Sequence, residues 1–141
     1  MKSKTGQIIQ YVLWNGLVGF IYITGVFGSS SLQSISQQFM LPVTIFTLLI
    51  SILSSLVVFV ALGVMDSLPV NDENLIKIYN TEPISLKIDI LVDSFFCIFL
   101  AVYSYPILGI MYLISMIFNG LNRWLKDVFD YHYNLKLKDN E

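Results

Sequence analysis

Long uncharged stretches dominate the pattern of this chain. The first of them has no charged residue between Lys4 and Asp66. A helix needs about 20 apolar residues to cross a bilayer, so this stretch predicts two spanning helices, over 6–27 and 39–65. Residues 28–38 between them are polar but uncharged, and we expect them to form a connector. The pattern predicts an all-α integral membrane protein with a single domain.

The third hydrophobic segment, residues 89–119, determines the topology. It begins with Asp89 and Asp93, one helical turn apart, and no further charge follows before Arg123. Pro106 lies in its middle and cannot donate the hydrogen bond of a continuous helix, so it bends or breaks the helix. Since long tilted or bent spans are common, we predict one long crossing that is bent at Pro106.

Charge counting favours another path for the same segment. With three crossings, the 8 Lys and Arg residues divide equally between the two sides of the membrane. If the segment turns at Ser104–Pro106 and returns as a re-entrant hairpin, all 8 lie on the cytoplasmic side, as the positive-inside rule prefers. Each half of that hairpin is short for a crossing, which is why we favour the single bent span. We expect a cytoplasmic N-terminus.

The remaining segments are polar or amphipathic. Residues 66–88 contain charges and turn-forming residues, which predicts a polar loop with one amphipathic turn at Leu75–Tyr79 on the membrane surface. Residues 120–141 place apolar side chains on one helical face and charged side chains on the other, which predicts a C-terminal amphipathic helix in the membrane interface. Lys2 and Lys4 before an apolar run are also typical of a signal peptide, but this run is longer than a signal core.

Composition agrees with this interpretation and excludes several functions. Hydrophobic residues make up 55% of the chain and charged residues 13%, whereas soluble domains have about twice that charge. The net charge of −2 does not indicate a nucleic-acid partner. Cys97 and His132 are the only cysteine and histidine, and no phosphate-binding glycine loop is present. We therefore expect no enzyme activity, no cofactor and no metal site.

Polar residues inside the apolar segments are the candidates for function, because such residues are costly in lipid. The start of a helix explains Asp89, since its positive end favours a carboxylate. Asp93 lies deeper and has two interpretations. It is either a functional residue that binds a proton or cation or contacts a partner, or a carboxylate at the membrane interface without such a role. Asn15 and Ser51 belong to polar stripes on the first two spans, and helix packing is the favoured interpretation of both.

A short pattern runs through residues 80–118. It consists of Asn80, Pro83-Ile84, the run Cys97-Ile98-Phe99-Leu100-Ala101-Val102 at a fixed distance from Pro83, Pro106, and Leu108-Gly109. This pattern resembles the small inner-membrane immunity proteins that protect bacteria from pore-forming colicins. The resemblance implies a multi-pass protein of the bacterial inner membrane that binds the toxin's pore-forming domain within the bilayer. It assigns no toxin-contacting residue.

Other functions fit the same features. Plasmid entry exclusion during conjugation, or a role as a small subunit of a membrane assembly, needs only membrane helices and a protein partner. An oligomeric channel or transporter component could use Asp93, although no internal repeat of the transporter type is visible. In each case we expect contact with lipid and with a membrane protein, and a homo-oligomer is compatible with all of them. The most concrete hypothesis is a non-enzymatic bacteriocin immunity protein.

Overall fold

Helices form all the regular secondary structure in the computed structural model, which describes residues 4–81 and 84–140. In chain order the elements are α1 (Lys4–Phe27), α2 (Ser30–Val64), the 3₁₀ helix η1 (Met65–Ser67), α3 (Glu73–Tyr79), α4 (Leu86–Val102) and α5 (Pro106–Asp139). The described residues contain no β-strand, so the predicted all-α class is confirmed. Lys2 and Pro83, which entered the charge count and the family resemblance, lie outside the described residues.

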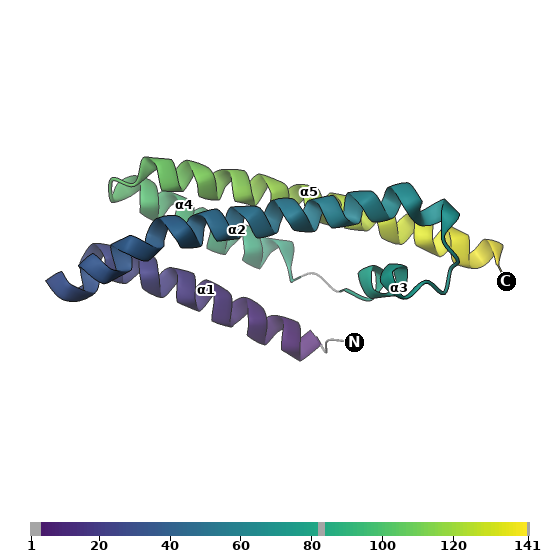
Figure 1. The fold of residues 1–141 in the computed structure, drawn as a ribbon, viewed down its shortest axis with the longest axis horizontal. Coiled ribbons are helices and arrows are strands. Elements are labelled where there is room, and N and C mark those ends of the chain that lie inside the picture. The colour runs from purple at the N-terminus through teal and green to yellow at the C-terminus, as the bar shows by residue number, and fades with distance from the viewer. Residues whose placement is uncertain (1–3, 82–83, 141) are drawn as a thin grey trace.

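Two antiparallel hairpins form an elongated bundle (Figure 1). α1 pairs with α2, α4 pairs with α5, and α2 and α5 pack together running in the same direction. The turns Gly28–Ser29 and Tyr103–Tyr105 lie towards one end of the bundle, and α3 and the C-terminus lie at the other. α1 and the stretch Ser30–Ser67 are both long and apolar enough to cross a membrane, with mean hydropathies of 1.4 and 2.7.

The predicted connector over 28–38 is wrong, because only Gly28–Ser29 separates the first two helices. α2 begins at Ser30 and includes the polar stretch. The polar side chains are used to hold the hairpin together. Gln37, for example, donates its amide to the carbonyl of Gly25 at 3.0 Å. The last carbonyls of a helix have no partner within it, so polar residues at this position satisfy the end of α1.

The prediction of one long bent segment over 89–119 is also wrong. α4 ends at Val102, and the chain reverses within Tyr103–Tyr105 before α5 begins. Ser104 adopts a left-handed conformation in this turn, with φ at 69°. Pro106 starts α5 instead of bending a helix, because its missing N–H costs nothing in the first helical turn. The structure has the hairpin that the charge count favoured.

The predicted amphipathic tail over 120–141 is not a separate helix, since α5 runs without a break to Asp139. Its apolar face packs within the protein and not against the membrane interface. Leu125 and Phe129 are buried against the end of α2 and against α3. The amphipathic turn expected on the membrane surface is α3, and its Leu75 is only 1% exposed because it packs into the same cluster.

Aromatic side chains fill the core between the two hairpins. The rings of Tyr22 on α1, Phe96 on α4 and Tyr112 on α5 meet with centroids 5.5–6.2 Å apart. Their edge-to-face geometry is a favourable arrangement for aromatic pairs. The Tyr22 hydroxyl is bonded to that of Thr44 on α2 at 2.6 Å, so the four long helices α1, α2, α4 and α5 are held together at this point.

Candidate functional site

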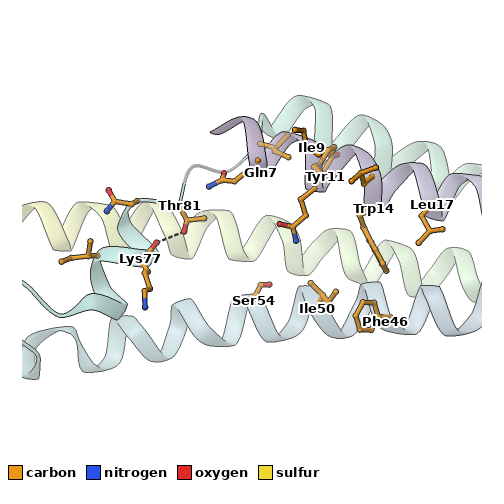
Figure 2. A pocket seen from close by; sticks show the side chains of 16 residues that line it. Gln7, Ile9, Tyr11, Trp14, Leu17, Phe46, Ile50, Ser54, Lys77 and Thr81 are labelled. Carbon is orange, nitrogen blue, oxygen red and sulfur yellow. Dashed lines mark hydrogen bonds between the residues drawn. The ribbon is translucent and has the colours of Figure 1, made fainter. Parts of the chain in front are cut away.

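An open groove lies between the first half of α1 and the middle of α2. α1 diverges from α2 towards the N-terminus, and α5 lies behind the gap (Figure 2). Figure 2 shows Trp14 reaching from α1 to Phe46 of α2, with ring centroids 5.4 Å apart. The groove has a volume of about 1420 Å³. Since an α-helix is about 10–12 Å across, this volume corresponds to about 15 Å of helix.

The chemistry of the groove changes along its length. Its inner part is apolar, with Leu13 and Leu17 on one wall and Ile50 on the other. Its outer part, near α3, is polar and includes Gln7 and Lys77. Such a gradient suits an occupant that is apolar over most of its length and polar at one end.

A second candidate site is a buried polar cluster between α4 and α5. Arg123 donates from Nη2 to Oδ2 of Asp89 at 2.9 Å, and both side chains are less than one-fifth exposed. One turn further in, Asn119 donates from Nδ2 to Oδ2 of Asp93 at 3.3 Å. Tyr112 also interacts with the Asp93 carboxylate, which is 5% exposed. The cluster therefore holds α4 against α5 through two polar pairs, Arg123–Asp89 and Asn119–Asp93, which we call the polar rungs.

A small cavity of about 180 Å³ adjoins these two rungs, lined by both carboxylates and by Gly120. It has room for a few water molecules and little else. In the part of the chain that the structure describes, no group of three or more His, Cys, Asp or Glu residues could hold a metal ion.

The structure brings two of the four predicted polar residues together and places the other two elsewhere. Asp89 and Asp93 belong to the cluster. Asn15 lies on α1 and donates to the carbonyl of Tyr11 at 3.0 Å, within its own helix. Ser51 is buried and shares a 2.7 Å hydrogen bond with Ser115 on α5. The packing role preferred for the stripe of Ser51 fits this contact.

Two partners in the cluster, Asn119 and Arg123, were not predicted as site residues. A signal for them exists in the residue numbers. Reflection of Asp89 and Asp93 through position 106 gives 123 and 119, so a hairpin turning near Pro106 pairs each carboxylate with a donor. The groove residues carry no comparable signal, because the divergence of two helices is a tertiary property.

Comparisons with protein-family models, with curated proteins and with solved structures find no match to this chain.

Proposed function

We propose that the chain is a multi-pass protein of the bacterial inner membrane, with both hairpins in the bilayer and both termini in the cytoplasm. The support is the distribution of charge. Neither helix turn contains a charged residue. The described basic residues lie at or towards the opposite end of the bundle: Lys4, Lys77, Lys87, Arg123, Lys126, Lys136 and Lys138. The positive-inside rule assigns that end to the cytoplasm.

The outer surface of the hairpins supports the same placement. Large apolar side chains point outwards on α1 and α2, including Phe20 (57% exposed), Leu53 (57%) and Phe59 (63%). Soluble proteins rarely expose continuous apolar surface of this kind, whereas lipid covers it at no cost.

The second hairpin is short for a full crossing. α4 has 17 residues and is about 25 Å long, compared with a hydrocarbon core of about 30 Å. Local thinning of the bilayer accommodates such a mismatch.

Within the membrane we propose a binding function, and most concretely bacteriocin immunity. The single observation that carries this proposal is the open groove between α1 and α2, which is apolar in its inner part and has a volume equal to that of about 15 Å of helix. A membrane-inserted helix of a pore-forming toxin domain, apolar over most of its length and polar at one end, matches the chemistry of the groove. The polar residues of the buried cluster already hold α4 to α5, so a transport role for Asp93 has less support.

A matched pair of tryptophan variants tests the groove. Ile50 lines the groove, and its neighbour Leu49 does not, although both are about half exposed (43% and 50%). Sensitive bacteria that express the native chain should survive a panel of pore-forming colicins. Ile50→Trp fills the groove and should abolish survival, whereas Leu49→Trp should preserve it at equal membrane abundance. Failure of the native chain to protect against any toxin of the panel would refute immunity.

The topology has an independent test. In a Cys97→Ser background, a cysteine introduced at Asn140 should be inaccessible to a membrane-impermeant thiol reagent added to spheroplasts. It should react after the membrane is opened. Labelling in intact spheroplasts would place the C-terminus outside and refute the two-hairpin arrangement.

A further inference from the structure

α5 uses its surface in stripes that follow a seven-residue repeat. With Ile107 assigned to heptad position a, the c and f positions face α4, as in the contact of Asn119 with Asp93. The b and e positions face α2, as in the bond between Ser115 and Ser51. Up to Asp130 each of these two stripes is buried or half-buried against the same chain, and beyond it the e positions His132 and Asp139 are exposed. The third stripe, at a and d, is not covered.

The first half of the uncovered stripe lies in the membrane-level part of α5. It consists of four isoleucines at alternating spacings of three and four residues: Ile107, Ile110, Ile114 and Ile117. Their exposed fractions run from 39% to 72%. Lipid can cover this half, so by itself it needs no protein partner.

The second half continues with the same spacing past Arg123 into the part of the helix that carries charged residues on its other faces. Its members are Leu121, Trp124, Val128, Tyr131 and Leu135. Trp124 is 61% exposed and Tyr131 is 64% exposed. Large aromatic side chains that are exposed at regular intervals along a charged helix are typical of a protein–protein interface.

We propose that a second copy of this chain covers the a/d stripe, so that two α5 helices pair side by side and in parallel. A strict heptad of apolar a and d positions is the pattern of a left-handed coiled coil. Two copies inserted in one membrane have the same orientation, which makes the pair parallel and related by a two-fold axis. This dimer goes beyond the proposed function, since it does not depend on toxin binding.

Charge complementarity across the pair supports a second copy as the occupant. In a parallel coiled coil a g position faces the e position five residues later on the other helix. Asp127 is at g and His132 is at e, and both are exposed. In its imidazolium form His132 donates from both ring nitrogens, from Nδ1 to the carbonyl of Val128 at 2.9 Å and from Nε2 to the Asp127 carboxylate of the other copy. The pairing occurs twice, once on each side of the axis.

Gly120, also at a g position, supports close approach of the two helices. A Cβ atom at this residue would meet nothing within 4 Å, and the residue also lines the small cavity beside Asp89 and Asp93. Glycine within a helix costs about 1 kcal/mol relative to alanine. A second backbone can approach the stripe closely at this position, because small residues allow membrane helices to pack closely. Gly16 and Gly63 have the same open space but lie on other helices.

Cysteine cross-linking of the full chain in membranes tests the dimer. In a Cys97→Ser background, Val128→Cys is at an a position, and Val60→Cys on α2 is an exposed control at 53%. On mild oxidation at low expression, Val128→Cys should give a disulfide-linked product of twice the chain mass, several-fold above the control. A product of any other mass, or no excess over Val60→Cys, would overturn the proposal, and the former would identify a different occupant.

A charge exchange tests the pairing itself. In the Val128→Cys chain, Asp127→Lys places a cation opposite the histidine and should reduce cross-linking several-fold. Adding His132→Asp restores an opposite-charge pair and should restore the product. Equal helical content and membrane abundance show that each variant folds. Loss of cross-linking without rescue by the second change would overturn the parallel register.

Discussion

Replacement of Arg123 by alanine tests whether the Arg123–Asp89 pair, the polar rung farther from the turn, holds α4 against α5. The guanidinium binds Asp89 at 2.9 Å through Nη2 and also donates to the carbonyl of Ile84. The side chains of Arg123 and Asp89 are 17% and 15% exposed. Removing the cation leaves a nearly buried carboxylate without its partner. Breaking a buried pair costs about 3–5 kcal/mol, and we expect about 3 kcal/mol here because residual exposure provides some screening.

A double-mutant cycle separates the pair from its parts. Arg123→Ala, Asp89→Ala and the double variant would be unfolded at equilibrium in mixed detergent and SDS micelles, with helical circular dichroism as the readout. The double variant should cost less than the sum of the two single variants by about 1–3 kcal/mol, since contacting residues are not additive.

The exposed pair of Lys77 and Glu73 provides the matched control. Its atoms are 3.7 Å apart and its side chains are 73% and 87% exposed. Exposed helix pairs contribute about 0.3–0.5 kcal/mol, so Lys77→Ala should be nearly neutral. If Arg123→Ala were no more destabilising than Lys77→Ala, or if the two single costs simply added, the rung would not hold the hairpin.

Three further predictions concern stability and use the same unfolding assay. Gly109→Ala brings a Cβ to 3.3 Å from the backbone of α4 and should destabilise the hairpin by about 1–3 kcal/mol. Gly16→Ala, where the space is open, should stabilise the protein by up to about 1 kcal/mol. Equal effects of the two variants would contradict the close contact between α4 and α5. Ser51→Ala removes the bond to Ser115 and should cost about 1 kcal/mol, and no change would show that the bond contributes nothing. S104G relieves a left-handed conformation and should stabilise by about 1 kcal/mol, so destabilisation would contradict the positive φ.

The sequence was sufficient for the helical class, for both ends of α1 and for the end of α2. The uncharged runs predicted α1 to within two residues, and the start of the polar loop predicted the end of α2. These features depend on local composition, which a single sequence displays. The stretch from Ser30 to Gln38 was misassigned for the same reason. Its polar composition is typical of a connector, and a sequence does not show the carbonyls at the end of α1 that these side chains bind.

The path of the third segment could not be decided by helix length. Pro106 is compatible with a kink and with a first helical turn, and only the tertiary contacts distinguish the two. The sequence singled out Asp89 and Asp93 as polar residues of interest, but their partners Arg123 and Asn119 lie across the turn and were not predicted. The groove was not predicted, because it depends on the angle between α1 and α2.

The length of α5 has a mechanical consequence. Its 34 residues form one rigid rod about 50 Å long that starts at the outer turn and ends beyond the bundle. A tilt of about 10° at the turn moves the far end sideways by about 9 Å over that length. Lys136 binds the carbonyls of Met65 and Leu68, so the end of α2 moves with it. Because the helix is unbroken, a small change of tilt at its start would produce a large displacement at its C-terminal end.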